Sequence, residues 1–243
     1  MRQFGLIGYP LSHSFSKNYF NRKFNDEGIH DCSYELYPIA SIAELKSLLD
    51  TEKGLHGLNV TIPYKEAVLP FIDHVSTAAQ QIGACNCISI KEGKLTGYNT
   101  DVIGFEQTLL PLLQPNHKKA LVLGTGGAAK AVAWVLQKLK IEYSYVSRHA
   151  KKGQLSYEQI DAAILKDFGI IINTTPLGMQ PNINQKPSLP YINLTEQHLC
   201  YDLIYNPEKT AFLQEAEKQG AVIKNGLDML LIQAEESWRI WNS

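Results

Sequence analysis

A lysine and an aspartate, each at the end of an expected strand, are the residues of this sequence best suited to proton transfer. Lys65 closes residues 59–65 (NVTIPYK), and Asp101 closes residues 97–101 (GYNTD). If the two strands are neighbours, the Asp101 carboxylate can orient the Lys65 ammonium and keep it charged until a reaction takes its proton. Such a pair suits the reduction of a carbonyl group by a nicotinamide, where the new alkoxide needs a proton. That chemistry requires neither a metal nor a covalent intermediate.

Each of these residues also has a plainer interpretation when it is taken alone. A single lysine is most often a surface residue, and an aspartate at a helix N-terminus is most often an N-cap. Asn59 and Thr61 alternate along one strand, so their side chains face the same side. Hydrophobic burial does not explain this polar pair beside Lys65, which favours the catalytic interpretation.

A third polar cluster, residues 12–17 (SHSFSK), lies between an expected strand and an expected helix. Hydroxyl groups at a helix N-terminus lie beside unpaired backbone N–H groups and the positive end of the helix dipole, a setting that suits a carboxylate. A serine N-cap explains the same residues equally well.

A glycine-rich turn, residues 123–129 (LGTGGAA), follows an apolar strand and precedes a helix. Glycines at such a turn let the backbone approach a pyrophosphate, which the helix N-terminus then binds. A tight structural turn is the alternative. The next strand ends in residues 147–149 (SRH), with Lys151 and Lys152 beyond, where an NAD site would place an acid. A guanidinium at this position can bind a 2′-phosphate, which favours NADP over NAD; a solvated basic loop is the alternative.

The elements that must position these residues are short apolar runs alternating with helix-length segments, a pattern that predicts an α/β fold with mostly parallel sheets. A second unit begins near residue 102. The expected strands are 4–7, 33–37, 57–62, 84–90, 94–98, 120–123, 142–147, 169–173, 200–204 and 221–223. The expected helices are 15–27, 42–49, 65–71, 101–113 (kinked or ended early by Pro111), 127–139 and 227–241.

Composition narrows the functional class. The 243 residues are 44% hydrophobic and 19% charged, which is enough apolar material for a core. The 23 basic and 24 acidic residues give a net charge of −1, which argues against a nucleic-acid or anionic-membrane binder. No targeting segment and no run long enough to cross a bilayer is visible, and the four cysteines are too few for a disulfide scaffold. We therefore expect a cytoplasmic protein whose partners are small molecules, as a monomer or homodimer.

Taken together, the ordered motifs resemble the shikimate dehydrogenase family over nearly the whole chain. The matching runs are GYPLSHSFS (8–16), GLNVTIPYK (57–65), IGACN (82–86), GYNTD (97–101), GTGGAAKA (124–131), NTTPLGM (173–179), DLIYNP (202–207) and NGLDMLLIQAEESW (225–238).

The resemblance implies reversible NADPH-dependent reduction of 3-dehydroshikimate to shikimate, a step of aromatic amino-acid biosynthesis. It also implies two domains: a shikimate-binding catalytic domain of residues 1–102 and 226–243, to which the C-terminal helix returns, and a Rossmann-type NADP-binding domain of residues 103–225. A relative acting on quinate or an aminated shikimate is the nearest alternative. A non-catalytic binding protein would be expected to lack Lys65 or Asp101, and a folate-linked dehydrogenase fits the serine cluster poorly.

The resemblance assigns roles to individual residues. Lys65 would donate and accept the proton, paired with Asp101. The remaining substrate ligands would be Ser14 and Ser16 at the carboxylate, Thr61, Asn86, Asp101 and Gln233 at the ring hydroxyls, Asn59 in support and Tyr205 closing the pocket. The cofactor ligands would be Gly126, Gly127, Ala128 and Ala129 at the pyrophosphate, Arg148 at the 2′-phosphate, and Thr174, Leu203 and Gly226 near the nicotinamide. Gly124 and Ser147 would be further cofactor residues.

Several positions depart from the family pattern. Lys17 stands where the family usually has proline, Cys87 where it has threonine, and Val102 where it has glycine. Only Arg148 is kept from the usual run at the cofactor strand. The segment between residues 149 and 172 is short, so we expect the crossover helix there to be reduced or missing.

Overall fold

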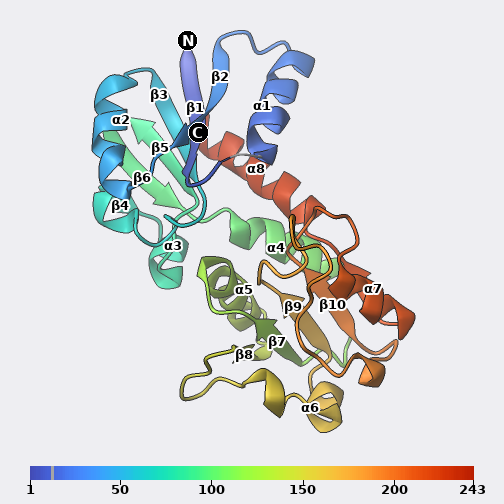
Figure 1. Ribbon diagram of the computed structural model, residues 1–243. Coiled ribbons are helices and arrows are strands. Elements are labelled where there is room, and N and C mark those ends of the chain that lie inside the picture. The colour runs from blue at the N-terminus through green and yellow to red at the C-terminus, as the bar shows by residue number, and fades with distance from the viewer. Residues whose placement is uncertain (12–13) are drawn as a thin grey trace. The chain divides into compact units, whose positions relative to one another are not determined.

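The structure, a computed structural model, describes residues 1–11 and 14–243 and divides into two compact units. The first comprises residues 1–100 with 234–243, and the second comprises residues 101–233. The long C-terminal helix α8 (Leu227–Trp241) contributes to both (Figure 1). Both units are α/β, as the alternating pattern predicts.

The first unit is built on a six-stranded sheet in the order β2-β1-β3-β5-β6-β4. Its elements are β1 (Arg2–Gly8), α1 (Phe15–Asp26), β2 (Cys32–Pro38), α2 (Leu45–Thr51), β3 (Leu55–Val60), β4 (His74–Val75), α3 (Thr77–Ile82), β5 (Cys87–Lys91) and β6 (Lys94–Tyr98). The sheet is mixed, because β5 runs antiparallel to both β3 and β6. The mostly parallel arrangement predicted for this unit therefore holds only for β1, β2 and β3 and for the short β4–β6 pair.

Two apolar cores lie on opposite faces of the first sheet. One holds Phe4, Phe20 and Tyr34 together with Trp241 of α8, whose indole stacks on Phe4 at 4.8 Å between ring centroids. The other holds Ile7, Leu45 and the inward side chains of β3 and β5. Burial on both faces fixes the strand register, and so fixes which residues end each strand.

One expected helix of this unit is wrong. Residues 65–71 form turns that end in a 3-10 turn at Leu69–Phe71. Pro63 precedes the segment and Pro70 lies within it, and a proline inside a helix removes a backbone hydrogen bond and clashes with the preceding turn.

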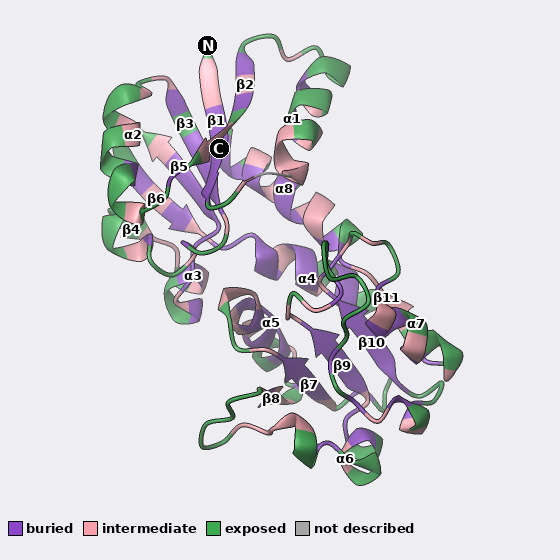
Figure 2. Ribbon diagram, in the orientation of Figure 1, coloured by how far each residue is buried: buried purple, intermediate pink, exposed green. Residues whose placement is uncertain are grey.

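The second unit contains the predicted Rossmann-type fold, a five-stranded sheet in the order β11-β10-β9-β7-β8 in which every pair is parallel. Its elements are α4 (Asp101–Leu109), β7 (Lys119–Leu123), α5 (Gly127–Lys138), β8 (Glu142–Val146), α6 (Ala162–Asp167), β9 (Ile170–Asn173), β10 (Leu199–Asp202), α7 (Ala211–Lys218), β11 (Val222–Lys224) and the first half of α8. Figure 2 shows its inner strands as buried. The strand order reverses between β7 and β9, and ligands of such sheets bind at the carboxyl ends of the strands at this point.

Two predictions about the second unit are confirmed. Helix α4 ends at Leu109 and gives way to a 3-10 turn around Pro111. The crossover between β8 and β9 is reduced, since α6 has only six residues.

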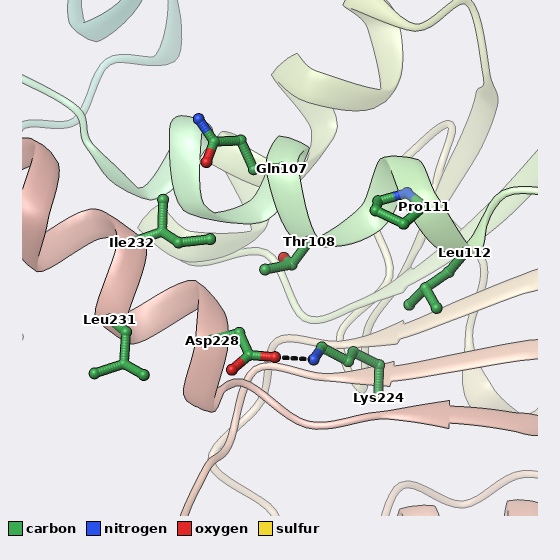
Figure 3. Close-up of a pocket in the computed structure, with 8 residues that line it drawn as sticks. All are labelled: Gln107, Thr108, Pro111, Leu112, Lys224, Asp228, Leu231 and Ile232. Atoms are coloured by element: carbon green, nitrogen blue, oxygen red, sulfur yellow. Dashed lines mark hydrogen bonds and ion pairs between the residues drawn. The ribbon is translucent and has the colours of Figure 1, made fainter.

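A groove of about 390 Å³ lies in this unit between the end of α4 and the start of α8 (Figure 3). Its walls include Leu112, Ile232 and the Lys224–Asp228 ion pair. Among the described residues that line it, none is a predicted substrate or cofactor ligand. Within the described part of the chain, no helix has the length and apolar composition needed to cross a membrane.

Candidate active site

Several of the predicted substrate ligands lie at the end of β3. Asn59 lies opposite Cys87 in the antiparallel β3–β5 ladder, and its amide nitrogen donates to the carbonyl oxygen of Asn86 at 3.3 Å. Thr61 extends the β1–β3 ladder, because its N–H donates to the Ile7 carbonyl at 3.0 Å. Strand pairing therefore places Asn59, Thr61 and Asn86 at one edge of the first sheet.

Lys65 lies just beyond this edge and is half-buried. Its carbonyl oxygen accepts a hydrogen bond from the Cys85 N–H at 2.7 Å. This bond holds the Lys65 backbone beside the segment that carries Asn86. The backbone of Lys65 is thus held close to predicted substrate ligands of the first unit.

The serine cluster is described from Ser14 onward; Ser12 and His13 lie outside the described residues. Ser14 is the N-cap of α1 and accepts from the Lys17 N–H at 3.4 Å, so the structural role foreseen for a serine here is present. Ser16 hydrogen-bonds Tyr34 of β2. The unusual Lys17 forms an ion pair with Glu35 at 2.6 Å.

Three predicted substrate residues belong to the second unit. Asp101 is the first residue of α4 and is 7% exposed. Gln233 of α8 is buried, and its amide nitrogen donates to the Leu230 carbonyl at 2.9 Å. Tyr205 follows β10, and burial raises the pKa of its phenol. The meeting of these side chains with Lys65 stays a prediction.

The glycine turn after β7 has the geometry that a pyrophosphate site needs. Gly124 has a φ of 107°, a conformation that favours glycine, and a Cβ there would lie 2.8 Å from Thr174 Oγ1. Gly126 is the N-cap of α5 without a side-chain cap, and a Cβ there would meet no heavy atom within 4 Å. The first N–H groups of this 12-residue helix thus receive no side-chain cap from Gly126, and the residues present fit a dinucleotide phosphate.

Arg148 lies in the loop that follows β8. It is exposed, and no ion pair joins it to any other described residue. The neighbouring backbone is ordered by hydrogen bonds: Ser147 Oγ accepts from the His149 N–H at 3.2 Å, and the Ser147 N–H donates to Leu155 at 3.0 Å. Arg148 is thus presented at the end of β8, as binding of a 2′-phosphate requires.

Three residues predicted near the nicotinamide lie at neighbouring strand ends. Thr174 follows β9, and its hydroxyl donates to the Leu123 carbonyl of β7 at 2.6 Å. Leu203 follows β10, and a Cβ on Gly226 would lie 2.0 Å from the Leu203 carbonyl oxygen. Only glycine fits this approach, so the backbone at Gly226 is held directly against Leu203.

Asp202 is a buried acid that the residue-by-residue predictions missed. It ends β10 at 0% exposure, and its carboxylate accepts from Asn173 Nδ2 at 3.0 Å, from Thr210 Oγ1 at 2.6 Å and from the Ile204 N–H at 3.0 Å. Burial raises the pKa of this carboxyl to about 6, although the three hydrogen bonds oppose the change. The sequence signal was its position at the end of an apolar strand.

The raised pKa gives a test by pH. Because folded Asp202 binds its proton more tightly than unfolded Asp202, its contribution to the free energy of unfolding decreases as the pH rises from about 4 to about 6. We expect the stability of the parent relative to Asp202→Asn to decrease over this range by roughly 3 kcal/mol and to level off above it. Urea unfolding of both proteins from pH 4 to 8 measures the difference. A difference that does not change with pH would contradict the burial argument.

A protein family and many known proteins match this chain in sequence. The family description "Shikimate dehydrogenase substrate binding domain" matches residues 6–88. A shikimate dehydrogenase (NADP(+)) of Staphylococcus aureus is 40% identical over 99% of this chain and 92% of its own length. The chain belongs to the shikimate dehydrogenase family.

Solved structures of the family agree with this assignment. A shikimate dehydrogenase crystallised with NADP+ superimposes with a TM-score of 0.88 at 36% identity, covering 99% of this chain and 90% of that one. The Thermus thermophilus enzyme in complex with NADP(H) and shikimate superimposes with a TM-score of 0.87 at 32% identity, covering 99% and 93%. The predicted family and its two-domain α/β fold are confirmed.

Proposed function

We propose that this chain is an NADP-dependent oxidoreductase that interconverts 3-dehydroshikimate and shikimate. The observation that carries the proposal is a full-length match, at about 40% identity, to relatives named shikimate dehydrogenase (NADP(+)). The phosphate-binding geometry of Gly124 and α5 and the absence of an acid among residues 147–153 support the choice of cofactor.

The proposed substrate ligands bind the carboxylate and the ring hydroxyls. Ser14 and Ser16 bind the carboxylate of the substrate, since both hydroxyls lie at the N-terminus of α1, where the helix dipole favours an anion. The ring hydroxyls are bound by Thr61, Asn86, Asp101 and Gln233, with Asn59 in support and Tyr205 closing the pocket.

Lys65 is the proposed proton donor and acceptor. NADPH, when bound, supplies the hydride that reduces the ketone carbon. Lys65 then gives a proton to the ketone oxygen, so that an alcohol forms and no alkoxide is left. Asp101 orients the Lys65 ammonium before the transfer. In the oxidation of shikimate, Lys65 takes the hydroxyl proton back.

The proposed cofactor site uses the strand ends of the second unit. The backbone of Gly124, Gly126, Gly127, Ala128 and Ala129 binds the pyrophosphate, and Ser147 and Arg148 bind the 2′-phosphate. Thr174, Leu203 and Gly226 lie on the nicotinamide side. Because residues 147–153, which follow β8, contain no Asp or Glu, they place no negative charge beside the 2′-phosphate.

The proposed setting is the cytoplasm, with small molecules as the only partners and a monomer or homodimer as the working form. The four cysteines are free thiols and are all buried, which is consistent with a reducing compartment.

An absorbance assay of NADP reduction tests the proposal. The purified chain should reduce NADP when shikimate is added, and NAD and quinate should each serve much less well. Quinate oxidised as fast as shikimate would instead favour the quinate relative. No NADPH formation with either substrate would refute the proposal.

A further inference from the structure

A buried network of polar side chains lies behind the predicted substrate ligands of the first unit. Its members come from β2, from the ends of β3, β5 and β6 and from α8, and none is more than 5% exposed: Tyr34, Asn59, Asn86, Thr100 and Ser237. Buried polar groups are costly unless they are hydrogen-bonded, so a network of this kind holds its members in one arrangement. Three of the five, Tyr34, Thr100 and Ser237, belong to no predicted site.

Asn59 is held at both ends of its amide. Its Oδ1 accepts from the Tyr34 hydroxyl at 2.8 Å. Its Nδ2 donates to Ser237 Oγ at 3.0 Å and to the Asn86 carbonyl at 3.3 Å. Both amide hydrogens are therefore used within the protein, and Asn59 acts on a substrate through its neighbours rather than as a donor.

Asn86 is oriented by Thr100. The Thr100 N–H donates to Asn86 Oδ1 at 2.7 Å, and Asn86 Nδ2 donates to Thr100 Oγ1 at 3.1 Å. A backbone N–H can only donate, so this bond decides which end of the Asn86 amide is the acceptor. The orientation of a proposed ring-hydroxyl ligand thus depends on where Thr100 lies.

Ser237 connects these two pairs. Its Oγ accepts from Asn59 and lies 3.4 Å from Thr100 Oγ1, within hydrogen-bond distance. At 0% exposure it is sealed from solvent. It lies on α8, separated by 178 residues from Asn59 and by 137 from Thr100.

We infer that Ser237, with Tyr34 at the far end of the network, is a positioning residue for substrate binding: it fixes the Asn59 amide and Thr100, and through Thr100 the Asn86 amide. The inference rests on the proposed function, because it takes Asn86 as a ligand of a ring hydroxyl. It assigns to the C-terminal helix a role in recognising the hydroxyl pattern of the substrate.

The test is Ser237→Ala in the full chain. Removing the hydroxyl leaves the Asn59 amide without one acceptor and uncouples it from Thr100. We expect the KM for shikimate to rise about tenfold, with the KM for NADP unchanged and kcat less affected. Ser89→Ala is the matched control, since Ser89 is also a buried serine of the first unit, but its Oγ has no hydrogen-bond partner among the described residues.

Substrate analogues separate positioning from a general loss of stability. For a shikimate analogue that lacks the hydroxyl bound by Asn86, Ser237→Ala should have no effect on KM, because the interaction that it weakens is already missing. Analogues that keep this hydroxyl and the one that is oxidised, but lack another, should keep the tenfold effect. An equal effect with every analogue, or a Ser237→Ala protein indistinguishable from Ser89→Ala, overturns the inference.

Tyr34→Phe provides a second variant if Ser237→Ala does not fold. It removes only the hydroxyl that donates to Asn59, and it should show the same analogue-dependent rise in KM. A rise that is the same for all analogues would again overturn the inference. A parent enzyme that does not act on shikimate refutes the proposed function instead, so the two failures are distinguishable.

Discussion

Lys65→Ala is expected to lower kcat by about 10²–10⁴-fold while changing the KM for shikimate only modestly. The variant lacks the group that gives a proton to the ketone oxygen, so the barrier to hydride transfer rises although the ligands of the carboxylate and ring hydroxyls remain. The fold should be preserved, because the hydrogen bond between Lys65 and Cys85 is made by the Lys65 backbone. Steady-state rates in both directions measure the effect.

Lys53→Ala is a suitable control for this variant. Lys53 lies in the same unit with its side chain 73% exposed, and it pairs only at the surface, with Asp50 at 3.3 Å. Its removal should leave kcat unchanged. If Lys65→Ala retained the turnover of the parent, Lys65 could not be the proton donor.

Arg148→Ala is expected to raise the KM for NADPH by about 10–100-fold and to leave the much weaker use of NADH unchanged. The guanidinium can make charge-assisted hydrogen bonds to a 2′-phosphate, and NADH has no such phosphate. Initial rates with each cofactor at saturating 3-dehydroshikimate measure the effect. Lys166→Ala removes an exposed cation of α6 in the same unit and should change neither KM.

The contrast between the two cofactors is what makes this experiment decisive. Equal losses with NADPH and NADH would mean that Arg148 supports the loop rather than the phosphate. A parent enzyme that used NAD as well as NADP would contradict the electrostatic argument for this position.

Local signals predicted much of the fold. Pro111 ends α4 because proline cannot continue a helix, and Glu92-Gly93 turns the β5–β6 hairpin with φ of 52° and 74°. The apolar run before Gly124 correctly indicated a strand, and the apolar stripe along residues 227–241 correctly indicated a helix. Local patterns fail for short segments: α3 has six residues and α7 has eight, and neither was predicted, while the expected helix over residues 65–71 is absent.

Only some residues of the candidate site could be predicted from the sequence around them. Lys65, Asp101 and the glycine turn stand out from their own neighbours in the sequence, whereas Tyr205 and Gln233 entered only through resemblance to a family. Ser237 carries no local signal, because its partner Asn59 is 178 residues away. Contacts of that range depend on the packing of α8 against the sheet, which periodicity alone does not specify.

Two backbone hydrogen bonds of Leu155 close the loop that carries Arg148. The Leu155 carbonyl accepts from the Ser147 N–H, and the Leu155 N–H donates to the Tyr145 carbonyl at 2.9 Å. Between these closing bonds the side chain at position 148 is exposed, so we expect its replacement to disturb little packing. Mutation at this single position is therefore nearly neutral for folding. A lineage carrying this scaffold could exchange one dinucleotide for the other within a few substitutions, while the substrate half of the molecule stayed as it was.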